Sequence, residues 1–231
     1  MINNYVALDL ETTGFSPYND KITEIGAILF ENGIEKARFE TFVYPGVAIT
    51  PQITKVTGIT DEMVKDAPDI SEVIEDLLDF IGNRILLGHN IRFDFSFIAK
   101  ASADKNIIYK AQGIDTYKVS QRCLPDISGR SLENICDYFG IETIHHRAAA
   151  DAVSASEIYH RMCSLSDSDK DVFELYFKSK KPEKITDKQI NFLRSLINRY
   201  SISYDKNIGD LTKSEASREI DRILSTYGYN R

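Results

Sequence analysis

The sequence is poor in cysteine and has no long apolar run, no internal repeat and no low-complexity tract. Cys123, Cys136 and Cys163 are the only cysteines in 231 residues. They form no CxxC pair, and their odd number argues against a disulfide framework. No apolar stretch approaches the roughly 18 residues of a membrane-spanning helix. The N-terminal segment MINNYVALDLETT lacks the basic start and long apolar run of a signal peptide. These absences predict a globular protein of the reducing cytoplasm with no membrane association.

Positive charge is scarce in the first three quarters of the chain. The whole sequence carries 28 Lys and Arg against 35 Asp and Glu, a net charge of -7. Residues 1–177 carry 16 against 28, net -12, whereas residues 178–231 carry 12 against 7, net +5. This asymmetry indicates two modules with different partners. A solvated acidic surface with a solubilising basic tail would give the same numbers.

The hydrophobic pattern of the first 165 residues predicts a mixed α/β sheet flanked by helices. Three strands come first, at 5–11, 22–30 and 37–45, and the last two flank the turn sequence Glu31-Asn32-Gly33. A helix is expected over 60–83, with Thr60 as its N-cap and an early break at Pro68. Further strands are expected at 84–90 and 113–119, and further helices at 93–103, 131–140 and 147–162.

The pattern loosens after this part of the chain. Residues 166–184 are polar and end in a basic, proline-containing stretch, which is typical of a linker. Two capping boxes follow, Thr186 with Gln189 and Thr212 with Glu215, and each opens an amphipathic stretch. We therefore expect a first domain over 1–165, a linker over 166–184 and a small helical module over 185–231.

Two carboxylates interrupt the first strand. Asp9 and Glu11 are two residues apart, so their side chains lie on the same face of the sheet. Their mutual repulsion would raise both pKa values unless a cation lies between them. Hard oxygen ligands of this kind favour Mg²⁺ or Mn²⁺. Two surface acids on a half-exposed strand would give the same pattern.

Two further aspartates stand where predicted helices begin. Asp94 follows a buried strand, where it could be a metal ligand or an N-cap residue, and the neighbouring Phe93 offers a surface on which a base could stack. Asp151 lies beside a run of alanines that allows a helix to pack closely against the sheet. From there Asp151 could reach the strand that carries Asp9.

The segment HHRAAAD, residues 145–151, offers two candidate histidines. Five residues of helix turn through about 500°, so His146 and Asp151 converge only if His146 lies in a loop before the helix. The preceding residues have no helical period, which allows this. We predict that His146 acts with Asp151, that His145 points elsewhere and that His160 has a packing or surface role.

These segments resemble a known family. DLETTG at 9–14, GHNIRFD at 88–94 and HHRAAAD at 145–151 match, in order, the three motifs of the histidine-containing DEDD (DEDDh) exonuclease superfamily. The likeness covers residues 3–163 and is greatest to the proofreading exonucleases of bacterial replicative polymerases, namely the epsilon subunit of DNA polymerase III and the exonuclease domain of the Gram-positive enzyme. Thr57 stands where many epsilon-like proteins have a histidine.

The resemblance implies an RNase H-like fold and 3′→5′ removal of nucleotides from a DNA end. Asp9, Glu11, Asp94 and Asp151 would then bind two Mg²⁺ or Mn²⁺ ions, and His146 would be the general base. Partners would be a single-stranded or frayed DNA 3′ end and a DNA polymerase or another replication or repair protein. Residues expected at the terminal nucleotide are Leu10, Thr12, Thr13, Ile59, Asn90 and Phe93. Core packing of Leu10 and Ile59, and a loop-holding role of Asn90, are the alternatives.

Two other functions remain open from the sequence. An exoribonuclease of the same fold would carry the same motifs, because none of them reads a 2′-hydroxyl. A non-catalytic nucleic-acid-binding or assembly subunit is disfavoured because all five catalytic positions are filled. The basic tail disfavours a phosphodiesterase of small molecules. Three roles remain open for the basic tail, residues 178–231. They are DNA binding, simple packing of a helix pair, and binding of a clamp protein through residues 189–193.

Overall fold

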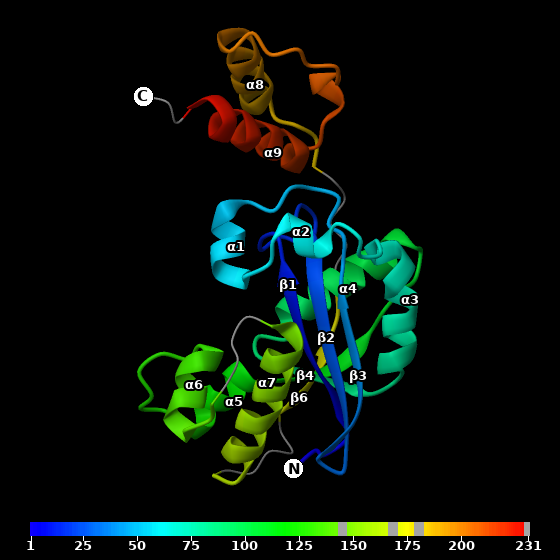
Figure 1. Ribbon diagram of the computed structural model, residues 1–231, viewed down its shortest axis with the longest axis vertical. Helices are drawn as coiled ribbons and strands as arrows, with labels where there is room; N and C mark the ends of the chain where they lie inside the picture. The colour runs from blue at the N-terminus through cyan, green and yellow to red at the C-terminus, as the bar shows by residue number, and fades with distance from the viewer. Residues whose placement is uncertain (143–146, 166–170, 178–182, 229–231) are drawn as a thin grey trace. The chain divides into compact units, whose positions relative to one another are not determined.

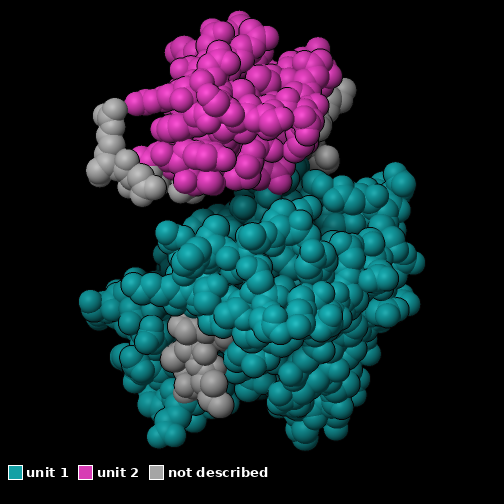
Figure 2. All heavy atoms as spheres, turned by 45° about the horizontal axis from the view of Figure 1, so that its top comes forward, with its two compact units in different colours: residues 1–177 teal, residues 178–231 magenta. Residues whose placement is uncertain are grey.

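The computed structural model describes residues 1–142, 147–165, 171–177 and 183–228. The chain forms two compact units, Met1–Phe177 and Lys178–Arg231, coloured separately in Figure 2. The prediction of a linker over 166–184 is wrong for residues 172–175, which form a strand of the first unit. Among the residues that the structure describes, no helix is long and apolar enough to cross a membrane.

The first unit is built on one mixed sheet flanked by helices, as predicted (Figure 1). Its strand order is β3-β2-β1-β4-β5-β6. The pairs β1–β2, β2–β3 and β5–β6 are antiparallel, whereas β1–β4 and β4–β5 are parallel. Asn32 and Gly33 both adopt left-handed φ angles, 54° and 74°, in the predicted turn between β2 and β3. The strands are β1 Tyr5–Thr12, β2 Ile22–Glu31, β3 Ile34–Phe42, β4 Ile85–Gly88, β5 Ala111–Asp115 and β6 Val172–Leu175.

Helices of the first unit follow the predicted order, but the structure adds helices over 51–57 and 116–123 that the sequence did not predict. Pro68 separates two helices as expected, but Thr60 makes no side-chain cap bond. The strand predicted over 113–119 ends at Asp115, because the Asp115 carboxylate accepts a hydrogen bond from Tyr117 N and caps a helix there. The helices are α1 Pro51–Thr57, α2 Asp61–Val64, α3 Ile70–Ile81, α4 Arg92–Asp104, α5 Thr116–Cys123, α6 Leu132–Phe139 and α7 Ala148–Cys163.

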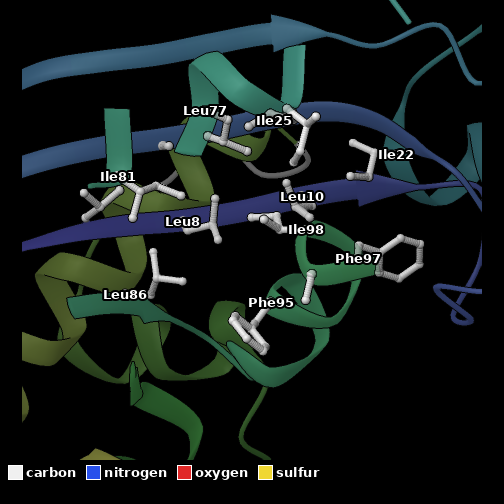
Figure 3. Close-up of a cluster of buried hydrophobic side chains, with 14 of the residues drawn as sticks. Leu8, Leu10, Ile22, Ile25, Leu77, Ile81, Leu86, Phe95, Phe97 and Ile98 are labelled. Atoms are coloured by element: carbon white, nitrogen blue, oxygen red, sulfur yellow. The ribbon is translucent and has the colours of Figure 1, made fainter. Parts of the chain in front are cut away.

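Two apolar clusters lie on opposite faces of the sheet. Leu8 and Leu10 of β1 pack with residues of α3 and α4 in one cluster, as Figure 3 shows. Tyr5 and Ala7 pack with residues of α5, α6 and α7 in the other. Because side chains alternate along a strand, the row of Tyr5 and Ala7 continues with Asp9 and Glu11, on the face that α7 covers.

The second unit is a small helical module with its own apolar cluster. It contains α8 Asp187–Arg199, α9 Lys213–Ile223 and the short helices η1 Ile208–Asp210 and η2 Leu224–Gly228. Both predicted capping boxes are confirmed, Thr186 with Gln189 on α8 and Thr212 with Glu215 on α9. Leu193 and Leu196 of α8 pack against α9.

Candidate active site

Three carboxylates from two elements converge at the carboxyl end of β1. Asp9 and Glu11 lie on the same face of that strand, and Asp151 lies in the first turn of α7. One oxygen of each carboxylate lies within 4.8 Å of the others. All three residues are half-buried. The alternative of two unrelated surface acids on β1 therefore does not describe Asp9 and Glu11.

The backbone of α7 lies directly on the backbone of β2, and this contact brings Asp151 to Asp9. Gly26 is the β2 partner of Asp9 in the strand register. A Cβ atom at Gly26 would lie 2.2 Å from Ala149 N and 2.3 Å from the Ala148 carbonyl carbon. The alanine-rich face expected to pack on the sheet, Ala148, Ala152 and Ala155, is buried, and Ala149 is buried beside it.

A charged pair fixes the N-terminus of α7 to the sheet. Glu24, opposite Glu11 in the register, is 5% exposed. Its Oε1 accepts hydrogen bonds from Arg147 Nε at 2.9 Å and lies 2.7 Å from Arg147 Nη2, and its Oε2 accepts one from Ala148 N at 3.3 Å. The Arg147 guanidinium also lies 5.2 Å from the centre of the Phe42 ring. The Glu24 carboxylate thus holds the N-terminus of α7 against the sheet.

Glu24 and Arg147 were not predicted from the sequence. The available signal was a charged residue in the middle of the apolar strand ITEIGAILF. A buried acid needs a partner, so its presence there predicts a cation close by. The partner stands 123 residues later in the chain, which no periodicity reveals.

Asp94 comes to the same strand from the opposite layer. It is the third residue of α4 and is 2% exposed, and its Oδ1 accepts a hydrogen bond from Leu10 N at 3.0 Å. Ile91 occupies the N-cap position of α4, so the N-cap interpretation of Asp94 is wrong. Asp94 lies outside the cluster of three, but its charge is the largest charge effect on Asp9.

The electrostatics of this site favour the binding of a cation. Burial raises the pKa of Asp9 well above its usual range, and the charges of Asp94 and Asp151 raise it further. Burial, with the charges of Asp151 and Glu24, raises the pKa of Glu11 to about 8. Burial also raises the pKa of Asp94, against the hydrogen bond from Leu10 N.

The donor set fits a hard divalent cation. Within the described ranges, no lysine or arginine forms an ion pair with Asp9 or Glu11. An all-carboxylate set is the kind of site that Mg²⁺ or Mn²⁺ prefers, and a bound cation would stabilise the ionised form of each group. Asp9, Glu11 and Asp151 form the group that could hold a metal ion, and a ligand role for Asp94 stays a prediction.

Two apolar residues expected at the substrate are buried. Leu10 is 5% exposed and points into the cluster beneath α3 and α4, on the face opposite Asp9 (Figure 3). Ile59 is fully buried in a separate small cluster with Ile49 and Val64. Both positions therefore show the packing that was the alternative interpretation, and contact with a nucleotide stays a prediction.

The polar residues expected at the substrate mainly organise loops. Thr12 Oγ1 donates to Gly14 O at 2.6 Å, and Thr13 Oγ1 accepts from Lys21 N at 2.9 Å. Asn90 adopts a left-handed φ of 65°, and its backbone N donates to Asp115 Oδ1 at 2.9 Å. The loop-holding alternative for Asn90 thus has a structural basis.

An aromatic surface lies beside Asp94. Phe93 is half-buried, with ring centres 5.0 Å from Phe97 and 6.4 Å from Phe15. Phe15 directly follows the DLETTG motif and is 90% exposed. Phe93 was predicted from the sequence, but Phe15 was not. The available signal for Phe15 was a large aromatic side chain in a polar loop.

The predicted base, His146, lies outside the described residues, as does His145. The first described residue after them is Arg147, the N-cap of α7. His160 packs as expected, with its Nε2 atom 2.7 Å from the Tyr5 hydroxyl. Burial lowers the pKa of His160.

Comparison with known proteins gives a family. The family model described as Exonuclease (RNase_T) matches residues 6–159. The chain is 39% identical over 159 residues to the PolC-type DNA polymerase III of Caldanaerobacter subterraneus subsp. tengcongensis, a match that covers 68% of this chain and 11% of that protein. It is 34% identical over 176 residues to the epsilon subunit of DNA polymerase III of Aquifex aeolicus, covering 75% of this chain and 83% of that subunit.

The fold has solved counterparts. The structure of E. coli Exonuclease I in complex with a dT13 oligonucleotide aligns with a TM-score of 0.63 at 17% identity, covering 71% of this chain and 42% of that one. This likeness shows the RNase H-like fold, as expected. The chain spans only about a tenth of the length of the PolC-type relatives that it matches. Because the family match spans residues 6–159 and includes every described carboxylate of the site, the chain belongs to the Exonuclease family.

Proposed function

We propose that this chain removes nucleotides from DNA 3′ ends, in the 3′→5′ direction, by metal-dependent hydrolysis. The observation that carries the proposal is the convergence of Asp9, Glu11 and Asp151 within 4.8 Å, beside the buried Asp94. A cluster of acids with raised pKa values is unsuited to hold a polyanion by itself, but it is suited to hold cations that do so.

Each residue of the site has a part in this proposal. Asp9, Glu11, Asp94 and Asp151 would hold two Mg²⁺ or Mn²⁺ ions. Bound there, the pair of ions would activate water and stabilise the leaving 3′-oxygen. His146 would accept the proton of the attacking water, because an imidazole with an ordinary pKa near 6.5 is neutral for part of its time at cellular pH.

The biological setting is also a proposal. The relatives are named as DNA polymerase III proteins, which favours a single-stranded or frayed DNA 3′ end as substrate and a DNA polymerase or repair protein as partner. Cys123, Cys136 and Cys163 form no disulfide within the described residues, which suits a reducing cytoplasm.

A digestion experiment tests the proposal. The chain would be incubated with Mg²⁺ or Mn²⁺ and 5′-labelled single-stranded DNA, paired duplex, duplex with a 3′ mismatch, and RNA. We expect a ladder of 5′-labelled products that shortens from the 3′ end, faster on single-stranded or mispaired DNA than on RNA. Asp9→Asn, which keeps the size of the side chain, should abolish the ladder. A faster ladder on RNA would instead assign an exoribonuclease, and product release from the 5′ end would contradict the direction.

A further inference from the structure

Lysine and arginine side chains without an ion-pair partner lie on α8 in the described part of the second unit. Lys213 pairs with Glu183 at 2.8 Å, and Lys206 and Arg222 both pair with Glu219, at 3.0 Å and 2.8 Å. On α8, by contrast, Lys188, Arg194 and Arg199 have no carboxylate within ion-pair distance in the described part of the chain. The cations of α8 are therefore available to a partner.

These cations share a face with an exposed aromatic ring. Lys188, Phe192, Ser195 and Arg199 follow one another at steps of four, three and four residues, which places them in one line along the helix. We call this line the α8 stripe. All four residues are exposed, Phe192 to 47%, whereas Leu193 and Leu196 face the core. No Asp or Glu occurs between Lys188 and Arg199.

The aromatic surface continues past the end of α8. The Arg199 guanidinium lies 5.7 Å from the centre of the Tyr200 ring. Tyr200 stacks on Tyr227 with ring centres 5.4 Å apart and an angle of 20° between the planes. Tyr227 is 44% exposed. Arg199 thus stands between Phe192, two turns earlier on α8, and the stacked rings of Tyr200 and Tyr227.

We propose that the α8 stripe binds single-stranded nucleic acid, with phosphates at Lys188 and Arg199 and a base stacked on Phe192. Cations that track a backbone and rings that stack on unpaired bases are the two elements of such surfaces. Paired bases in a duplex would leave Phe192 without a stacking partner. The inference rests on the proposed function, since the first unit, at net -12, repels a polyanion outside its metal site.

Binding would be measured with the full chain carrying Asp9→Asn, in chelator, so that no strand is cut. Fluorescence anisotropy would follow a labelled oligothymidylate, its oligouridylate counterpart and a duplex across a range of salt concentrations. Lys188→Gln with Arg199→Gln should flatten the plot of log K against log salt by about 1.4, because each lost single-strand phosphate contact accounts for about 0.7. The matched control, Lys206→Gln with Lys213→Gln, removes the same charge from paired positions and should leave the slope unchanged.

A second variant separates stacking from charge. Phe192→Ala should weaken binding by roughly 5- to 100-fold without changing the salt slope, the range seen when one base loses its stacking ring. Phe192→Trp should retain affinity, whereas Phe192→Leu, which stays apolar, should not. Circular dichroism melting would verify that each variant folds.

Several outcomes would overturn the inference. One is an equal effect of the α8 and control double variants, and another is wild-type binding by Phe192→Leu. A third is displacement of the labelled strand by polyglutamate as readily as by unlabelled oligothymidylate. That third result would point to an acidic protein partner. Hydrolysis of a short oligonucleotide by the unmutated chain is measured separately. A chain that binds but does not cut would refute the proposed function alone, and one that cuts while its α8 variants bind normally would refute only this inference.

Discussion

Adding a single methyl group at Gly26 should separate the carboxylates of the site while leaving the fold intact. The new Cβ atom would lie 2.2 Å from Ala149 N and 2.3 Å from the Ala148 carbonyl carbon. Both are backbone atoms at the start of α7, so no side-chain rotation can relieve the contact. Because carbon atoms pack at about 3.5–4.0 Å, the first turn of α7 must retreat by more than about 1 Å.

The retreat would act on Asp151, which lies in that same turn. Its carboxylate oxygen is within 4.8 Å of oxygens on Asp9 and Glu11, which stay on β1. Overpacking of this kind lowers the free energy of unfolding by about 1–3 kcal/mol. A misplacement of about 1 Å in a catalytic group lowers the rate by about 10²-fold. We therefore expect Gly26→Ala to fold, to bind Mn²⁺ more weakly and to lose about 10²-fold in single-turnover hydrolysis.

Urea unfolding, calorimetric titration with Mn²⁺ and single-turnover hydrolysis would measure the three effects on one preparation. Gly209→Ala is the matched control, because its Cβ would meet only Asn207 Oδ1, at 3.6 Å. If Gly26→Ala kept the rate and the Mn²⁺ affinity of the unmutated chain within threefold, close backbone contact would not be what places Asp151.

Other predictions follow from the same site. Arg147→Ala, which leaves the buried Glu24 carboxylate without its cation, should lower the free energy of unfolding by about 1–3 kcal/mol. Arg161→Ala, which breaks an exposed pair on the same helix, should lower it by about 0.5 kcal/mol or less. Equal losses in urea unfolding would contradict the conclusion that the Arg147–Glu24 pair fixes α7 to the sheet. His146→Ala should slow hydrolysis by roughly 10²–10⁴-fold and His145→Ala far less; comparable losses in steady-state rates would reverse the assignment. In chelator the raised pKa of Glu11, about 8 against 4.5, contributes stability that is complete below about pH 4.5 and is lost as the pH rises through 8. Urea unfolding should show a fall of a few kcal/mol across that range, at about 1.4 kcal/mol per pH unit for Glu11 alone. The fall should be smaller in Glu11→Gln, in which Asp9 and Asp94 keep their raised pKa values; identical pH profiles for the two proteins would contradict this.

Local patterns predicted the elements that position the site. Alternation along YVALDLE placed Asp9 and Glu11 on one face of β1, and the alanine-rich start of α7 predicted its close approach to the sheet. The capping boxes of α8 and α9 were readable because each is complete within four residues. Interactions confined to a few neighbouring residues leave a signature in the sequence.

Long-range pairings left no such signature. The strand β6 is short, polar residues precede it, and its partner β5 stands about 60 residues earlier in the chain. Residues 172–175 were therefore predicted to be part of a linker. Asp94 looks like a helix cap because its true acceptor role, toward Leu10 N, spans 84 residues. The strand predicted over 113–119 extended too far because apolar residues continue beyond Asp115. In the structure Asp115 ends β5 and caps α5.

The site joins two layers that could open separately. Asp94 belongs to α4 and its cluster on one face of the sheet, whereas Asp151 belongs to α7 and its cluster on the other. Proteins open in cooperative parts whose free energies lie below that of global unfolding. Opening of either layer would move one of these two carboxylates away from β1. If both bind metal, as proposed, metal affinity would report on the layer that opens more easily. Heating should therefore abolish hydrolysis before the sheet melts, and hydrogen exchange in α4 and α7 would identify the layer that yields first.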